Sequence, residues 1–237
     1  MFKRNDLYYL IFASAGIPEY ISYSTAPTVE GPWTYRGFIM ERAPHLAFTN
    51  HPGIIDFKGN SYFFYHSQAL SGDGFKRSIA VEQFEFNPDG SIPLILPTKE
   101  GIRESVANLN PFSRVEAETI AWSEGLKTAE QDDIGMYVTK INNGDFIKVR
   151  SVDFASGARS FKASVASASK GGRIEIRLGS LDGPLIGTSR VRRTRGFTNW
   201  NEVNCKITPV GGVHDLYFVF TGGEGELFNF DWWMFSK

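Results

Sequence analysis

The segment Arg173-Ile-Glu-Ile-Arg-Leu178 alternates charged and apolar side chains residue by residue. Because successive side chains of a β-strand point to opposite faces of the sheet, this pattern predicts a strand with one buried and one solvated face. Residues 161–165 and 216–220 show the same period, and turn-forming stretches such as Asn142-Asn-Gly-Asp145 and Leu181-Asp-Gly-Pro184 separate such segments. Helical periodicity is nearly absent, so the chain is expected to be all-β.

Charge and composition disfavour several classes of partner. The 237 residues carry 25 basic and 26 acidic side chains, so neither nucleic acid nor a membrane surface is an expected partner. No apolar run approaches the ~20 residues of a membrane span, and the N-terminus lacks the layout of a signal peptide. The single cysteine, Cys205, excludes an intrachain disulfide. The basic cluster Arg190, Arg192, Arg193 and Arg195 is interpreted as a solvated loop beside a binding face.

The first hundred residues differ in their pattern of apolar side chains. Leu7-Tyr-Tyr-Leu-Ile-Phe12 and Ser61-Tyr-Phe-Phe-Tyr65 are continuous apolar or aromatic runs, typical of strands buried on both faces. The turn signals Phe57-Lys-Gly-Asn60 and Asn87-Pro-Asp-Gly90 close short strands in up-and-down order, from which about two propeller blades are expected. The predicted organisation is an incomplete β-propeller over residues 1–100, a linker over 101–110 and a β-sandwich over 111–237.

Several short segments after residue 110 agree, in order and spacing, with one known family. They are Pro111-Phe-Ser-Arg-Val-Glu-Ala-Glu118, Asn143-Gly-Asp-Phe146, Val152-Asp-Phe154, Ile174-Glu-Ile-Arg-Leu178, His214-Asp-Leu-Tyr-Phe-Val-Phe-Thr-Gly-Gly223 and Leu227-Phe-Asn-Phe-Asp-Trp232. Through them, residues 111–237 resemble carbohydrate-binding module family 6. The resemblance implies a jelly-roll β-sandwich that binds xylan, cellulose or other β-glucans, often with a structural calcium ion.

Three carboxylates are candidate ligands for that ion. Glu116 and Glu118 are two residues apart and so point to the same side of an edge strand, and Asp231 lies in the expected last strand. Converging carboxylates repel each other unless a hard cation with oxygen ligands lies between them. From the residues alone, ordinary exposed strand charges are the simpler interpretation. The resemblance instead favours structural calcium bound by Glu116, Glu118 and Asp231.

The resemblance also implies a sugar cleft in the loops at one end of the sandwich, where two aromatic rings enclose a sugar and an asparagine binds its hydroxyls. The asparagine corresponds to Asn229, and Phe197 stands where the family usually has a stacking tryptophan. The second ring, usually tyrosine, corresponds to Lys140, with Tyr137 three residues earlier as the alternative. Because phenyl stacks more weakly than indole and lysine brings a charge, we expect a weakened cleft or one retuned toward a decorated or uronic-acid-bearing chain. Core packing is the alternative role for Phe197.

The first half resembles the C-terminal part of glycoside hydrolase family 43, the five-bladed propellers that include β-xylosidases and α-arabinofuranosidases. The segments that carry this resemblance are Phe2-Lys-Arg-Asn-Asp-Leu-Tyr-Tyr-Leu10, Gly31-Pro-Trp-Thr-Tyr35, Asn50-His-Pro-Gly53, Tyr62-Phe-Phe-Tyr-His66 and Phe86-Asn-Pro-Asp-Gly90. By resemblance, His51 faces the propeller axis and a central metal, and Arg77 reaches toward the substrate; an ordinary structural role for His51 stays open. The resemblance places the three catalytic carboxylates outside this chain, so its own catalysis is left uncertain.

The function predicted for the chain is hemicellulose handling, with xylan or arabinoxylan as the partner, as a fragment of a secreted glycoside hydrolase of the β-xylosidase or α-L-arabinofuranosidase type. A carbohydrate-binding protein without catalysis is the alternative. Two blades cannot close a propeller, so Leu7–Phe12 and Ser61–Tyr65 are expected to expose strand edges and apolar surface. Self-association through residues 1–100, as a symmetric dimer, is therefore expected.

Overall fold

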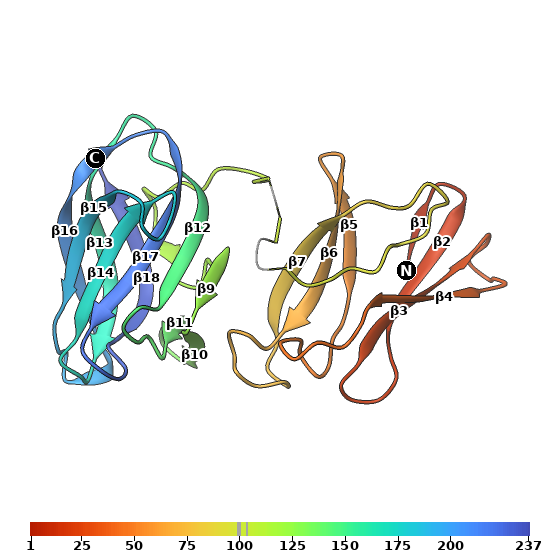
Figure 1. Cartoon of the computed structure of the whole chain (residues 1–237), viewed down its shortest axis with the longest axis horizontal. Coiled ribbons are helices and arrows are strands. Elements are labelled where there is room, and N and C mark those ends of the chain that lie inside the picture. Colours follow the sequence, from red (N-terminus) through yellow and green to blue (C-terminus); the bar gives the residue numbers. More distant parts are fainter. Residues whose placement is uncertain (99–100, 103) are drawn as a thin grey trace. The chain divides into compact units, whose positions relative to one another are not determined.

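The structure is a computed structural model that describes residues 1–98, 101–102 and 104–237. None of these residues lies in a helix, which confirms the all-β prediction. The described part of the chain accordingly offers no helix that is long and apolar enough to cross a membrane. Two compact units, Met1–Glu104 and Ser105–Lys237, each have their own sheets (Figure 1).

The first unit consists of two antiparallel sheets that correspond to two propeller blades. Their strand orders are β1-β2-β3-β4 and β5-β6-β7, so each strand pairs with its neighbour in sequence, as in a propeller blade. The strands are β1 (Phe2–Arg4), β2 (Leu7–Ser14), β3 (Tyr20–Ala26), β4 (Thr34–Met40), β5 (Gly53–Phe57), β6 (Asn60–Ser67) and β7 (Ser78–Phe84). The expected hairpin turn joins β5 to β6: Phe57 pairs with Asn60, and Lys58 and Gly59 have φ values of 50° and 80°. Positive φ at both turn residues is what a type I′ turn requires.

The core of the first unit lies between its two sheets. Tyr9 and Ile21 from the first sheet and Phe63 and Tyr65 from the second belong to one buried cluster. The buried Tyr9 hydroxyl also donates to the Gly90 carbonyl oxygen at 2.7 Å, which ties the predicted turn at residues 87–90 to the first sheet. One shared core therefore holds the two blades together.

The two aromatic runs differ in how completely their strands are paired. Ser61–Tyr65 lies in β6, between β5 and β7. Leu7–Phe12 lies in β2, where Tyr8 and Tyr9 pair with both β1 and β3, whereas residues 10–12 pair with β3 alone. The predicted strand edge is therefore absent for Ser61–Tyr65, where β6 is the central strand of its sheet, but present for residues 10–12 of β2. Apolar surface is exposed at Phe64 of the second segment, as predicted, and Phe64 belongs to the outer face of the β5-β6-β7 sheet. We call it the outer blade face, and it includes Ile55, Phe57, Phe64 and Ile79.

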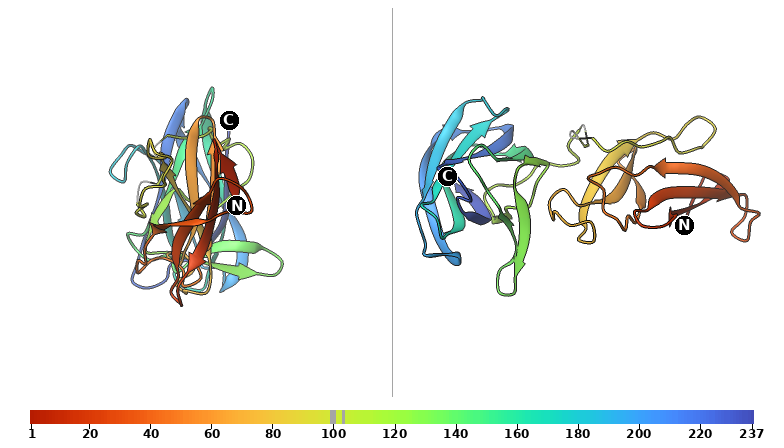
Figure 2. Two further views of the ribbon diagram at one scale, coloured as in Figure 1. Left: turned by 90° about the vertical axis from the view of Figure 1, so that its right-hand side faces the viewer. Right: turned by 60° about the horizontal axis from the view of Figure 1, so that its bottom comes forward.

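The second unit is a β-sandwich of two sheets. It is the green-to-blue part of the chain in Figure 2. One sheet has the order β10-β11-β18-β13-β16, with β8 paired to β18, and the other has the order β15-β14-β17-β12-β9. The strands are β8 (Val115–Glu116), β9 (Trp122–Glu124), β10 (Lys127–Gln131), β11 (Gly135–Thr139), β12 (Phe146–Asp153), β13 (Ala158–Ser167), β14 (Gly172–Leu178), β15 (Leu185–Val191), β16 (Gly196–Val210), β17 (Val213–Gly222) and β18 (Asn229–Ser236). The alternation in β14 has the predicted sense: Ile174 and Ile176 are fully buried and Arg173 is exposed.

The second half of the predicted linker belongs to the sandwich unit. Leu109 forms a parallel bridge with Val152, and the hydroxyls of Ser105 and Ser151 are hydrogen-bonded. Position 103, inside the predicted linker, lies outside the described residues, as do positions 99 and 100 of the predicted propeller. The boundary between the two compact units falls between Glu104 and Ser105.

Candidate functional site

Several strands of the sandwich begin or end at one end of the unit. The registers pair Asn229, the first residue of β18, with Ala166 near the end of β13, and Ser167 with Gly196 at the start of β16. In the other sheet, Gly172 at the start of β14 pairs with Gly222 at the end of β17. The loops that follow these strand ends therefore converge, and we call this region the loop end of the sandwich.

Asn229 is held rigidly at the loop end. Its side chain is 2% exposed, and its Nδ2 donates a hydrogen bond of 2.6 Å to the carbonyl oxygen of Phe197. Its Oδ1 is buried and accepts no hydrogen bond from any described residue. Buried polar atoms are nearly always hydrogen-bonded, so an unpaired amide oxygen at a loop end is an unused acceptor.

The backbone carbonyl of Phe197 contacts Asn229, whereas the ring of Tyr137 packs against Trp200. Phe197 is half-buried, so part of it faces solvent beside the amide. Tyr137 is 9% exposed, and its ring packs edge-on against Trp200, with ring centroids 5.1 Å apart. The Tyr137 ring is thus committed to packing within the sandwich.

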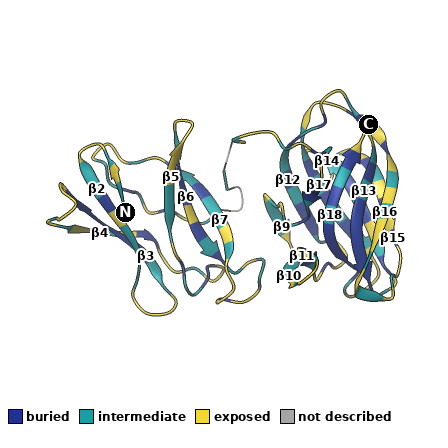
Figure 3. Cartoon of the chain, turned by 180° about the vertical axis from the view of Figure 1, so that it is seen from behind, coloured by how far each residue is buried: buried dark blue, intermediate teal, exposed yellow. Residues whose placement is uncertain are grey.

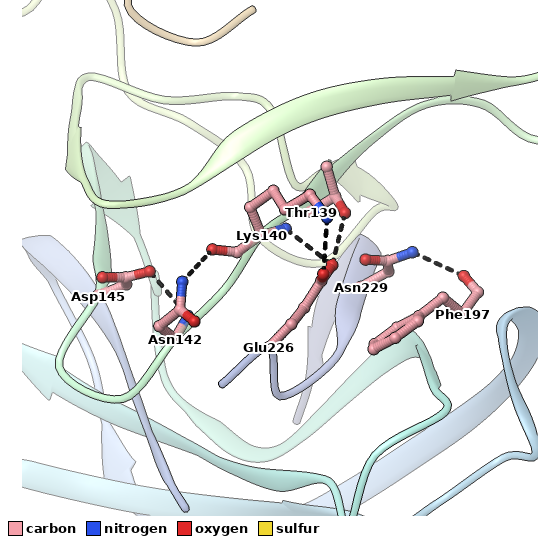
Figure 4. Close-up of polar contacts among 7 residues, drawn as sticks. All are labelled: Thr139, Lys140, Asn142, Asp145, Phe197, Glu226 and Asn229. Carbon is pink, nitrogen blue, oxygen red and sulfur yellow. Dashed lines mark hydrogen bonds and ion pairs between the residues drawn. The ribbon is translucent and has the colours of Figure 1, made fainter. Parts of the chain in front are cut away.

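Lys140 forms an ion pair that was not anticipated. Its Nζ lies 2.9 Å from Oε2 of Glu226, while Oε1 of Glu226 accepts hydrogen bonds from the Thr139 hydroxyl and the Lys140 backbone N–H (Figure 4). The hydrogen bond to Glu226, together with its negative charge, raises the pKa of Lys140. Val138 pairs with Phe230 in this antiparallel ladder, which places Thr139 opposite Asn229. The ion pair is therefore adjacent to the unpaired amide, and its positive charge is already neutralised.

The turn before β12 borders the loop end and is held in place by hydrogen bonds. The Asp145 carboxylate accepts from the backbone N–H of Asn142 at 2.8 Å, and the Asn142 side chain donates to the carbonyl oxygen of Lys140 at 2.7 Å (Figure 4). Lys140 itself has a φ of 57°, in the left-handed region. These contacts hold a non-glycine residue in a conformation that is otherwise unfavourable.

The three predicted calcium ligands lie near one another where β8 pairs with β18. Glu116 pairs with Trp232, and the backbone N–H of Ala117 donates to the carbonyl oxygen of Asp231 at 2.7 Å. Burial raises the pKa of Glu118, and the negative charges of Glu116 and Asp231 raise it further. Burial likewise raises the pKa of Asp231. The structure thus brings these carboxylates close enough for the charges of Glu116 and Asp231 to raise the pKa of Glu118.

Arg114 lies among these carboxylates. Its guanidinium contacts both Glu116 carboxylate oxygens, at 2.8 and 2.9 Å, and lies 3.4 Å from Asp231. Glu118 Oε2 is buried and has no hydrogen-bond partner among the described residues. In residues 1–98, 101–102 and 104–237, no three His, Cys, Asp or Glu side chains lie close enough to hold a metal ion as they stand. A cation would therefore have to compete with Arg114.

In the first unit, a histidine pair forms around the fully buried Asn50. The backbone N–H of His66 donates to the Asn50 side-chain oxygen at 2.8 Å, and the His51 N–H donates to His66 Nδ1 at 3.3 Å. The rings of the two histidines are 5.9 Å apart, and His51 is exposed. Burial lowers the pKa of His66, and the positive charge of Arg77 lowers it further. The structure thus brings His51 and Arg77 close to one imidazole.

Two protein-family models match the chain, and together they cover most of its length. Residues 1–92 match the glycosyl hydrolases family 43, and residues 116–237 match the carbohydrate binding module (family 6). The two matches follow the same order as the two units, and the predicted propeller and β-sandwich are confirmed by solved structures of both families.

Individual relatives support the same assignment. An arabinoxylan arabinofuranohydrolase of Bacillus subtilis is 42% identical over 93% of this chain, which covers 45% of that protein. A crystal structure of a family 43 arabinoxylan arabinofuranohydrolase from Bacillus subtilis with cellotetraose superposes with a TM-score of 0.73 at 39% identity, covering 100% of this chain and 53% of the other. A family 6 module from Clostridium cellulolyticum with xylose is 41% identical, with a TM-score of 0.53, over 54% of this chain and 100% of the module. The chain thus spans about half the length of the enzymes that it matches.

Proposed function

Because the chain belongs to glycosyl hydrolase family 43 through residues 1–92 and to carbohydrate-binding module family 6 through residues 116–237, we propose that it acts in hemicellulose breakdown. In this proposal, the sandwich binds a xylan or arabinoxylan chain. The first unit forms part of a catalytic domain that removes arabinofuranosyl or xylosyl groups from it, as the names of the relatives suggest. A secreted location is part of the proposal, since such polymers lie outside cells. Carbohydrate binding without catalysis is the alternative.

The observation that carries sugar binding is the unpaired Oδ1 of Asn229. Leaving a buried amide acceptor without a donor costs about 1–3 kcal/mol unless a ligand provides one. A sugar hydroxyl is a suitable donor, and the partly exposed Phe197 beside it can stack on the C–H face of the same ring. Because Oδ1 is buried, a neighbouring side chain has to move when the hydroxyl enters.

The Lys140–Glu226 pair favours a neutral sugar at Asn229 itself. A free lysine would attract an acidic sugar, but here its charge is compensated by Glu226 at 2.9 Å. The pair occupies the place where the family usually has a second stacking ring, so a single ring, Phe197, is left to stack. We therefore infer that affinity in this cleft depends more on hydrogen bonding than on stacking.

The test is calorimetric titration of the chain with an arabinose-decorated xylo-oligosaccharide. Asn229→Ala should weaken binding by about 1–3 kcal/mol, because the hydroxyl loses its acceptor. Asn204→Ala is the matched control, since Asn204 is exposed on β16 and pairs with Lys162, away from the loop end. Unchanged affinity for Asn229→Ala would move sugar binding to another face. No binding even by the unmodified chain would mean that Phe197 and Lys140 leave the cleft inactive.

A structural calcium ion is a further part of the proposal. Its support is the buried and unpaired Glu118 Oε2, which lies near the negative charges of Glu116 and Asp231. The three side chains would have to move closer together to bind an ion, and their carboxylate oxygens are donors of the kind that a hard cation prefers. Calcium would hold these three side chains and link the first strand of the sandwich to the last, with Arg114 turning away from Glu116. Its role would be stability, not chemistry.

Self-association completes the proposal. The outer blade face exposes Ile79 to 77% and Ile55 to 50%, on the same side of one sheet as Phe57 and Phe64. Contiguous apolar surface of this kind is usually covered by another protein surface. We propose that a second copy of the chain covers it, with the same face on both copies.

A further inference from the structure

Five arginines that the proposed function does not use lie at or near the loop end of the sandwich. Arg173 and Arg190 are exposed and directly opposite each other on β14 and β15. The remaining three are exposed on the loop from β15 to β16: Arg192, Arg193 and Arg195. Val191, at the end of β15, pairs with Gly172 at the start of β14, which places the beginning of that loop at the loop end. We call these five side chains the arginine rim.

The arginine rim lacks compensating charge. Within residues 1–98, 101–102 and 104–237, none of its members forms an ion pair. Like charges directly opposite on neighbouring strands destabilise a sheet, so the Arg173–Arg190 pair is unfavourable as it stands. Of the nearby acidic residues, Glu226 is engaged by Lys140 and Asp145 by Asn142, while Glu224 is exposed on the loop after β17.

The loop that carries the rim is nevertheless rigid. The Thr194 side chain turns inward: its hydroxyl accepts from the Ser167 N–H at 2.8 Å, and its backbone N–H donates to the Ser167 carbonyl at 2.8 Å. Arg195 is held in the left-handed region with φ of 73°. The loop backbone is thus anchored through one inward threonine, and its three arginines are exposed and available to a ligand.

Ser167, which anchors the loop, also connects the rim to the sugar cleft. The Ser167 hydroxyl donates to the carbonyl oxygen of Leu227, two residues before Asn229, and Asn229 in turn donates to Phe197. Arg195 precedes Phe197 by two residues, which is at most about 7 Å of chain. A polymer whose backbone sugar lies on Phe197 and Asn229 therefore has its substituents within reach of the rim.

We propose that the arginine rim binds the carboxylates of uronic-acid substituents on a polysaccharide whose neutral backbone occupies the Asn229 cleft. Guanidinium groups match carboxylates in a planar, two-pronged geometry and keep their charge at all physiological pH values. This assigns charge recognition to the rim and not to Lys140, whose charge is compensated. The inference rests on the proposed sugar-binding function, since the cleft supplies the neighbouring contact.

The test compares three polymers in affinity electrophoresis: a uronic-acid-substituted xylan, the same polymer after reduction of its carboxyl groups, and a sulfated polysaccharide. The chain should bind the acidic xylan about tenfold more tightly than the reduced one at low salt. Because salt screens exposed ion pairs, the ratio of the affinities for the acidic and the reduced xylan should fall toward one at ~0.5 M salt. Equal binding of the acidic and reduced xylans, or tighter binding of the sulfated polymer, would overturn the proposal.

The variant Arg192→Gln/Arg193→Gln/Arg195→Gln should lose the preference and keep its affinity for the reduced polymer within about twofold. The control variant is Arg159→Gln, in which an exposed arginine at the start of β13, the strand end opposite the loop end, is removed. If the triple variant retains the preference for the acidic xylan, the proposed role of the arginine rim is wrong. Failure of the unmodified chain to bind the reduced polymer contradicts the sugar cleft instead, so the two failures are distinguishable. The salt titration of the unmodified chain tests the rim independently of any folding defect in the variant.

Discussion

The two units differ in how completely they cover their apolar side chains. In the sandwich, Phe218, Phe220 and Trp233 are 0% exposed between two sheets. In the first unit, Phe64 and Ile79 on the outer blade face are 38% and 77% exposed. Figure 3 shows how buried and exposed positions are distributed along the strands of both units. Both units have aromatic-rich strands, so composition does not separate them. The difference is that each sandwich sheet has a second sheet to cover its apolar face, whereas the β5-β6-β7 sheet leaves several apolar side chains of its outer face exposed.

The largest effect should come from truncating a core ring of the sandwich. Phe218→Ala should lower the free energy of unfolding of the second unit by about 3–5 kcal/mol, because it removes a fully buried ring and leaves a cavity. Phe64→Ala, the matched change in the first unit, should lower stability by only about 1 kcal/mol. Urea-dependent hydrogen exchange of peptides from β17 and β6 reports each unit separately. Similar losses for both variants would contradict the contrast between the units.

Calcium should stabilise the second unit alone. An ion that binds only the native state raises the free energy of unfolding by about 2.7 kcal/mol at a free concentration of one hundred times its Kd. Melting curves of the chain with calcium and with chelator measure this effect. Glu118→Gln should abolish it and, in chelator, should raise the melting temperature, because the variant no longer buries a carboxylate charge. Coincident curves at saturating calcium would remove the site from the proposal.

Self-association should depend on the first unit alone. Ile79→Glu places a charge on the outer blade face and removes an apolar contact worth about 1.5–3 kcal/mol, so the dimer should dissociate. Light scattering over a concentration series provides the measurement. Val29→Glu, on the loop between β3 and β4 and away from that face, is the control with the same added charge. A concentration-independent monomer before any substitution would refute the dimer.

The smallest expected effect concerns pH and the first unit. The pKa of His66 is lowered in the folded state, so between that pKa and its usual value of about 6.5 the unfolded chain binds the extra proton. The stability contributed by His66 is therefore present above about pH 6.5 and is lost as the pH falls through this window. Hydrogen exchange in β6 should accelerate from pH 7 to 5, after correction for the intrinsic rate, and His66→Gln should reduce this acceleration. An unchanged pH dependence in the variant would assign the effect to other groups.

The strand pattern and the family resemblance could both be obtained from sequence. Alternation in residues 173–178 predicted the buried face of β14 correctly, and the turn at 57–60 predicted the β5–β6 hairpin. The prediction of a sheet edge failed for Ser61–Tyr65 and was right only for residues 10–12 of the first segment, because a continuous apolar run indicates burial but does not say how many neighbours a strand has.

The candidate site was predicted residue by residue but not in its connections. Asn229 and Phe197 were identified together, and the structure joins them by a hydrogen bond of 2.6 Å. Glu226 and Arg114 were missed, although each forms an ion pair with a predicted site residue. An acidic residue three positions before Asn229 was a weak signal, but nothing local links position 226 to position 140.

The sequence by itself determined the all-β class, the order of the two units and the residue types available at the loop end. Period-two alternation and turn residues are local properties, and they depend only on how successive side chains leave the backbone. Only the tertiary structure decided that Lys140 is neutralised by Glu226, 86 residues away, and that Arg173 stands opposite Arg190 with no compensating acid among the described residues. Such pairings depend on strand register and on which loops converge, because electrostatic energy follows distances in space and not positions along the chain.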